Sequence, residues 1–98
     1  MFVKITKSYR DVVAICDSSI LGKKFEEGKL QLDVKESFYK GEEISEEEAI
    51  EIMKNMSIED ATFNIAGKES VNASIKAGII TGENTGKVQG VPFALILL

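Results

Sequence analysis

Basic residues that lie close to aromatic rings are the groups of this sequence most suited to chemistry. Two groups show this arrangement: Lys4, Lys7 and Arg10 around Tyr9, and Lys23 and Lys24 before Phe25. Ammonium and guanidinium groups bind phosphates, and a neighbouring ring can stack on a base. The pattern predicts RNA contacts by these five basic residues, although Glu26 and Glu27 weaken the second group. The alternative is a solvated lysine surface with Phe25 in the core.

The usual residues of enzyme active sites are scarce. The sequence has no histidine and one cysteine, Cys16. Without histidine, the usual catalytic triads and most metal sites are excluded. Asp17 follows Cys16, and its charge disfavours the thiolate that a nucleophile needs, so we expect a packing cysteine. We therefore expect no catalytic residue, no bound metal and no cofactor, and we favour a protein that is not an enzyme.

Two further segments resemble ligand sites only weakly. Residues 82–88 are one residue too short for a phosphate-binding loop, and Val88 replaces the hydroxyl that would bind magnesium. Acidic residues gather at 42–47 without the spacing of a calcium loop, and they are typical of a helix N-terminus. We interpret the first segment as a turn and the second as a solvated helix face.

Length and charge restrict the choice of architecture and location. The 98 residues suffice for one domain, spanning 1–98. The formal net charge of −4 is uneven, because residues 41–60 carry −7 while residues 1–40 carry +2 and residues 61–98 carry +1. No apolar run is long enough to cross a membrane, and residues 1–7 lack the apolar stretch of a secretory signal. We expect a cytoplasmic protein without membrane contacts.

Hydrophobic periodicity predicts an α/β (α+β) fold, with a small mixed sheet of about five or six strands and two main helices. Alternating or β-branched runs predict the strands, at residues 2–6, 11–16, 29–34, 61–65 and 93–98. Asp17 or Ser18 is expected to cap a short helical turn. Helices are predicted over residues 44–56, with a capping box at Ser45 and Glu48, and over residues 68–77. The inner face of the second helix is predicted to consist of Val71, Ser74, Ile75 and Ala77.

The last segment, residues 93–98, is wholly apolar. A strand covered on both faces has this composition, so we predict a central strand. The alternative is an edge strand that pairs with a second copy or with another protein.

The order of several short motifs resembles a small archaeal family catalogued as domain of unknown function 424. The most specific block is Leu21-Gly22-Lys23-Lys24-Phe25-Glu26-Glu27-Gly28, and later blocks are Asn64-Ile65-Ala66-Gly67 and Gly90-Val91-Pro92. The motif residues are Gly22, Lys23, Phe25, Gly28, Gly90 and Pro92. The resemblance implies a cytoplasmic α/β protein, and it leads us to expect a histidine where this chain has Phe93. It supplies no function.

These observations lead to two functional hypotheses. The first is a non-enzymatic module that binds RNA or a ribonucleoprotein and is linked to translation. The second is a protein–protein interaction or homodimerisation module that uses the C-terminal strand or the acidic helix.

Overall fold

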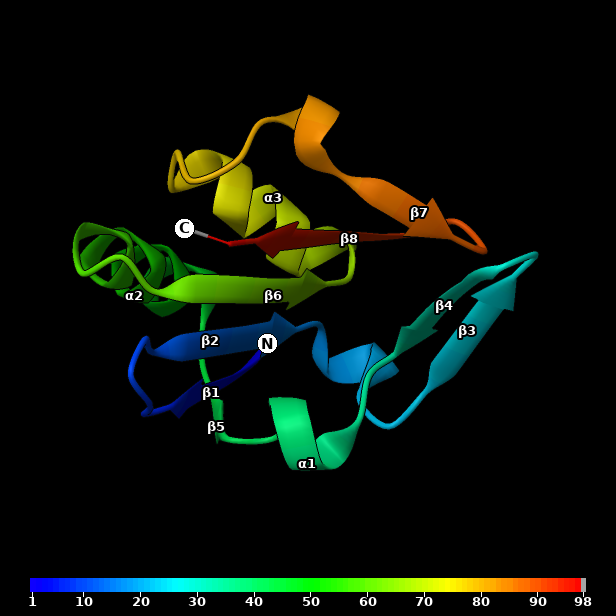
Figure 1. Cartoon of the computed structure of the whole chain (residues 1–98), viewed down its shortest axis with the longest axis horizontal. Coiled ribbons are helices and arrows are strands. Elements are labelled where there is room, and N and C mark those ends of the chain that lie inside the picture. Colours follow the sequence, from blue (N-terminus) through cyan, green and yellow to red (C-terminus); the bar gives the residue numbers. More distant parts are fainter. Residues whose placement is uncertain (98) are drawn as a thin grey trace.

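The structure is a computed structural model that describes residues 1–97. A six-stranded mixed sheet forms its centre (Figure 1), in the order β5-β1-β2-β6-β8-β7. Its strands are β1 (Phe2–Thr6), β2 (Val12–Cys16), β5 (Glu42–Glu43), β6 (Thr62–Ala66), β7 (Gly86–Val88) and β8 (Val91–Ile96). The β2–β6 pair is parallel, and the other pairs are antiparallel. The predicted α+β architecture with a mixed sheet is confirmed.

A separate hairpin of two strands, β3 (Lys24–Glu27) and β4 (Leu30–Asp33), packs against one face of the sheet. The strand predicted at residues 29–34 corresponds to β4, but its partner β3 was not predicted. Three of the four side chains of β3 are charged and exposed, so that Phe25 alone marks its inner face. This one apolar position is too weak a signal for a strand.

The helices are η1 (Ser18–Ile20), α1 (Glu36–Tyr39), α2 (Glu46–Ile58), α3 (Lys68–Lys76) and η2 (Gly82–Asn84). The capping box predicted for the first long helix is confirmed. The Ser45 hydroxyl accepts from the Glu48 amide at 3.2 Å, and the Ser45 amide donates to the Glu48 carboxylate at 3.3 Å.

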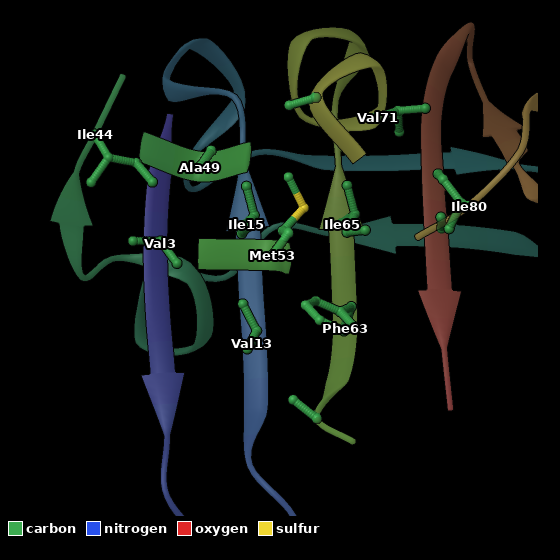
Figure 2. Packing of buried hydrophobic residues seen from close by; sticks show 13 residues of the cluster. Val3, Val13, Ile15, Ile44, Ala49, Met53, Phe63, Ile65, Val71 and Ile80 are labelled. Carbon is green, nitrogen blue, oxygen red and sulfur yellow. The ribbon is translucent and has the colours of Figure 1, made fainter. Parts of the chain in front are cut away.

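The main core lies between the sheet and the two long helices, on a side that we call the helix face. Val13, Ile15, Phe63 and Ile65 point to this side from β2 and β6, and α2 places Met53 over them (Figure 2). A second cluster lies on the opposite face, beneath α1 and the β3–β4 hairpin. Its buried members are Ala14, Cys16, Leu32, Val34, Tyr39, Ala66 and Val88.

The predicted inner face of α3 is partly wrong. Val71 and Ser74 are buried, but Ile75 is 40% exposed, and the fully buried positions include Ser70 and Ala73. The buried stripe is therefore rotated by about one residue from the predicted one. Hydrogen bonds allow the rotation, because the Ser70 hydroxyl donates to Asp17 and the Ser74 hydroxyl donates to the Ser70 carbonyl, at 2.7 and 2.8 Å.

The C-terminal strand is central along only part of its length. β6 pairs with Phe93 to Ile96, whereas β7 reaches only residues 91–93. Leu95 is 56% exposed and Leu97 is 71% exposed. The prediction of a strand covered on both faces is wrong for this half, since the β3–β4 hairpin packs on the other end of the sheet face to which Leu95 belongs. Residue 98 lies outside the described residues.

Candidate functional site

The first predicted basic group lies at the turn between β1 and β2. Lys4 lies in the middle of β1, and its ammonium donates to the Ser37 carbonyl at 2.6 Å. Lys7 pairs with Asp11 at 3.1 Å, with a largely exposed ammonium. Tyr9 is fully in solvent at the turn, and Arg10 beside it is exposed. The structure thus places Lys7, Tyr9 and Arg10 at one end of the sheet, with Lys4 farther along β1.

The second group lies elsewhere. Lys23 and Lys24 follow η1, beyond the other end of β2. Five strand residues, or about 16 Å, therefore separate them from the β1–β2 turn. Lys24 lies 3.4 Å from the Glu26 carboxylate, which partly neutralises it. The five predicted residues therefore do not form one continuous patch.

The pairing of the strands brings together the residues of a surface that the basic residues alone did not indicate. Lys4 pairs with Ala14, Ala14 with Asn64, and Asn64 with Leu95. The next row joins Thr6, Val12 and Thr62. Directly opposite residues point to the same side of a sheet, so both rows face away from α2 and α3.

We call this surface the open face; it consists of Lys4, Thr6, Val12, Thr62, Asn64, Leu95 and Leu97. The β3–β4 hairpin covers only the other end of the same sheet face, where Cys16 and Ala66 are buried. Figure 2 shows the two hairpin strands, in faint teal, crossing behind the sheet nearer to Ile15 than to Val13. None of the open-face side chains is a carboxylate.

The electrostatic character of the open face differs from that of the whole chain. Four of the eight acidic side chains of the 41–60 segment lie on α2, whose first turn alone holds Glu46, Glu47 and Glu48. Glu42 and Glu43 lie on β5 beside β1, and Glu59 and Asp60 follow α2. α2 packs on the helix face, so the sheet separates the carboxylates of α2 from the open face. Lys7 and Arg10 border the open face from the β1–β2 turn.

Of the seven open-face residues, the sequence interpretation singled out only Lys4, and the missed residues include Thr62, Asn64 and Leu95. The signal for two of them was present. The alternation along β6 places Phe63 and Ile65 in the core, and therefore places Thr62 and Asn64 on the other side. Leu95 could not be found in this way, because every residue of its segment is apolar.

Comparison with known proteins bears on the family but not on the ligand. The model of the family described as "Protein of unknown function (DUF424)" matches residues 5–98. The chain belongs to this family. A crystal structure of an uncharacterized conserved protein from Methanopyrus kandleri has the same fold, with a TM-score of 0.83 and 22% identity, over 97% of this chain and 88% of that chain. Among curated proteins there is no significant match.

Two of the blocks that carry the family resemblance meet at a junction of two turns. Gly28 lies at the tip of the β3–β4 hairpin with a φ of +60°, and Gly90 lies in the β7–β8 turn with a φ of +78°. These are left-handed conformations that glycine adopts without strain. The Glu27 carboxylate accepts from the Gln89 amide at 2.6 Å and ties the two hairpin tips together.

Two aromatic side chains connect this junction with the interior of the protein. Phe25 and Phe93 both pack against the cluster beneath the hairpin. The Phe93 ring lies so close to Gly86 that an added Cβ there would be 2.7 Å from it. Phe93, which stands where the resemblance implied a histidine, is therefore a packing residue in this chain. Lys23 contributes backbone bonds, since its carbonyl accepts from the Val34 amide at 2.9 Å.

Asp17 has a role that the sequence interpretation assigned wrongly. It makes no side-chain cap on η1. Its buried carboxylate instead accepts from the Glu69 amide at 3.0 Å and from the Ser70 amide and hydroxyl, both at 2.7 Å. Asp17 therefore caps α3 from 52 residues away. A side chain at Gly67 would clash with this carboxylate, which explains the glycine.

Cys16 and Tyr39, the last residue of α1, are buried in the same hydrophobic cluster. Burial, together with the Asp17 charge, raises the pKa of the Cys16 thiol to about 11. Burial and the nearby Cys16 raise the pKa of Tyr39 to about 12. Both groups are neutral at physiological pH, so the thiol is a packing group there and not a nucleophile.

Residues 1–97 contain no cluster of three or more residues of the types that bind metal ions. Within the same part of the chain, no helix has the length and hydrophobicity required to cross a bilayer.

Proposed function

We propose that this protein is a non-enzymatic RNA-binding module whose open face contacts single-stranded RNA. The observation that carries the proposal is the uncovered half of the sheet, which offers Lys4, Thr62 and Asn64 without any carboxylate of its own. Single-stranded RNA presents phosphates to cations and unstacked bases to hydrogen-bonding and flat apolar groups.

Each part of the surface has a counterpart in such a ligand. Lys4, Lys7 and Arg10 contact phosphates, while the exposed Tyr9 ring stacks on a base. Asn64 donates to and accepts from base edges. The Thr62 hydroxyl, which donates to the Asp11 carbonyl at 3.5 Å, accepts from them. Leu95 supplies an apolar platform. Lys23 and Lys24 provide a separate set of phosphate contacts for RNA that extends past β2.

Fluorescence anisotropy with a labelled, unstructured oligoribonucleotide measures the affinity. Three phosphate contacts on a single strand give a slope of about −2 for log affinity against log salt. Affinity should therefore fall about 20-fold between roughly 50 and 200 mM salt. The Lys4→Ala, Lys7→Ala, Arg10→Ala triple variant should lose most of this dependence.

A matched variant removes three exposed lysines that lie off the open face: Lys29→Ala, Lys54→Ala and Lys76→Ala. It changes the net charge equally, so an equal loss of affinity would refute the open face as the site. Affinity that does not respond to salt would refute phosphate contact altogether. The Lys23→Ala, Lys24→Ala double variant should add its own loss, because distant sites contribute independently.

The free edge of β8 favours homodimerisation as a second candidate function. The Pro92 carbonyl accepts from Gly67 on the β6 side at 2.8 Å. Backbone groups alternate along a strand, so Leu95 and Leu97 direct theirs to the other edge, beyond the end of β7. A hollow of about 310 Å³ lies between this edge and Ile79, Ile80 and Asn84.

A second copy could pair its own edge here in antiparallel fashion. Light scattering would then show a dimer for the unmodified chain and a monomer for Leu95→Pro, which lacks the edge amide. Leu95→Ala keeps the amide and serves as the control. A monomer at every concentration contradicts this candidate and leaves the RNA proposal untouched.

A further inference from the structure

A cleft of about 370 Å³ lies between α3 and the β7–β8 hairpin, at the opposite side of the sheet from the open face. Figure 1 shows α3 behind β8, with β7 beside it at the edge of the sheet. The side chains of interest in its wall are Lys68, Asn72, Ile75, Thr85, Lys87 and Pro92. Its volume falls within the lower range of small-molecule pockets.

The fold places these side chains toward one another. Lys68, Asn72 and Ile75 are spaced at i, i+4 and i+7, so they share one side of α3. Lys87 is directly opposite Pro92 in the β7–β8 pair, and both face the helix. The hydrogen bond from the Gly67 amide to the Pro92 carbonyl, at 2.8 Å, joins the start of α3 to β8.

Within residues 1–97, no acidic side chain pairs with the two lysines of the cleft. Neither the Lys68 nor the Lys87 ammonium forms an ion pair or a hydrogen bond there, whereas Lys76 on the same helix pairs with Glu46 at 2.6 Å. No carboxylate lines the cleft. Asp17 already occupies the amides at the N-terminus of α3, so the two lysines are the groups available to an incoming anion.

We propose that this cleft binds a phosphate monoester of a small molecule with a flat, largely apolar body. A monoester carries a charge of about −1.5 to −2 near neutral pH, which two ammonium groups balance. Asn72 donates to the phosphate or to the hydroxyls next to it. The Thr85 hydroxyl already donates to the Gly82 carbonyl at 2.9 Å, so it accepts from a hydroxyl of the ligand. Ile75, which is 40% exposed, and Pro92 supply the apolar surface for the body of the ligand.

Adenosine monophosphate, inorganic phosphate and adenosine are the three probes, and amide chemical shifts in NMR are the readout. Adenosine monophosphate should give saturable shifts confined to residues 68–75 and 85–92, with a dissociation constant of about 1 mM or below. Inorganic phosphate should shift the same amides more weakly, and adenosine should not saturate.

Variants distinguish a specific binding site from unspecific attraction of the phosphate to lysines. Lys68→Ala and Lys87→Ala should each weaken the binding of adenosine monophosphate about tenfold, the effect of one charge-assisted hydrogen bond. Lys76→Ala removes a lysine of α3 outside the cleft and should leave the affinity unchanged. Chemical shifts elsewhere in each variant verify that it is folded.

Three results would overturn the proposal. One is the absence of saturable shifts at about 10 mM adenosine monophosphate. Another is an equal loss of affinity in Lys76→Ala and Lys68→Ala, which would indicate unspecific attraction. The third is adenosine binding as tightly as its monophosphate. RNA binding at the open face uses none of these lysines, so its outcome is independent.

Discussion

Removal of the Asp17 carboxylate is the sharpest test of how the two halves of the chain are joined. Asp17 follows β2, and its carboxylate is buried against the first turn of α3. We expect Asp17→Ala to destabilise the whole domain and not only α3. The reason is that the cap is also the tertiary link between β2 and the α3 segment.

The size of the effect follows from the donors that would lose their partner. Ser70 is fully buried, and its amide and hydroxyl both donate to Asp17 at 2.7 Å. A buried donor left unsatisfied costs about 1–3 kcal/mol, so these two cost about 4 kcal/mol together. The Glu69 amide is closer to solvent and can turn to water. Asp17→Asn keeps one acceptor oxygen and should cost only about 1–2 kcal/mol.

Urea unfolding followed by circular dichroism gives the free energies of unfolding. About 4 kcal/mol is a large part of the 5–15 kcal/mol that is usual for a domain, so Asp17→Ala should unfold at much lower urea. Asp11→Asn is the control, because Asp11 makes a solvent-exposed ion pair that is expected to contribute below about 1 kcal/mol.

A double-mutant cycle with Ser70→Ala decides whether the link acts as described. The Asp17–Ser70 coupling should be about 1–2 kcal/mol, since one hydroxyl bond is shared. A coupling near zero, or a loss in Asp17→Ala no larger than in Asp11→Asn, would refute the reasoning.

Three further predictions concern stability. Ser45→Ala removes the cap of α2 and should lower the free energy of unfolding by about 1 kcal/mol in urea titrations. Gly41→Ala would place a Cβ against the backbone of β1 and should lower the free energy of unfolding by about 2 kcal/mol. Gly82→Ala would place its Cβ in free space, so this control should change Tm by only a few degrees. Because burial raises the pKa values of Cys16 and Tyr39 to about 11 and about 12, the contribution of these two groups to stability should be constant below about pH 9 and fall from about pH 9 to about 12. Cys16→Ala should remove the first part of that fall; an unchanged profile would contradict the assignment.

Local patterns predicted the parts of the fold that local forces determine. The alternation at residues 2–6 and the capping box at Ser45 each involve neighbours in sequence, and both were predicted correctly. β3 was missed because its stability comes from pairing with β4 and from one side chain, Phe25. The role of Asp17 was missed because its partners lie 52 and 53 residues away.

The candidate site shows the same division. Residue types were enough to single out Lys4, Lys7 and Arg10, because cations near an exposed ring are visible in the sequence. Their connection to Asn64 and Leu95 depends on a parallel pairing of β2 with β6 and on an antiparallel pairing of β6 with β8. Neither of these two features can be recognised from a short stretch of sequence. The Lys68–Lys87 cleft likewise depends on how α3 lies against the sheet.

The net charge of −4 is a poor guide to the ligand because the fold separates the charges. The acidic α2 lies on the helix face, and layers in such a fold are spaced by about 10 Å. The Debye length at physiological ionic strength is about 8 Å, so the field of α2 is largely screened at the open face. A phosphate approaching that face meets Lys4 and Arg10, together with Lys7, which is paired with Asp11 at 3.1 Å, and the carboxylates of α2 lie on the other side of the sheet. An acidic chain can therefore present a surface suited to an anionic polymer.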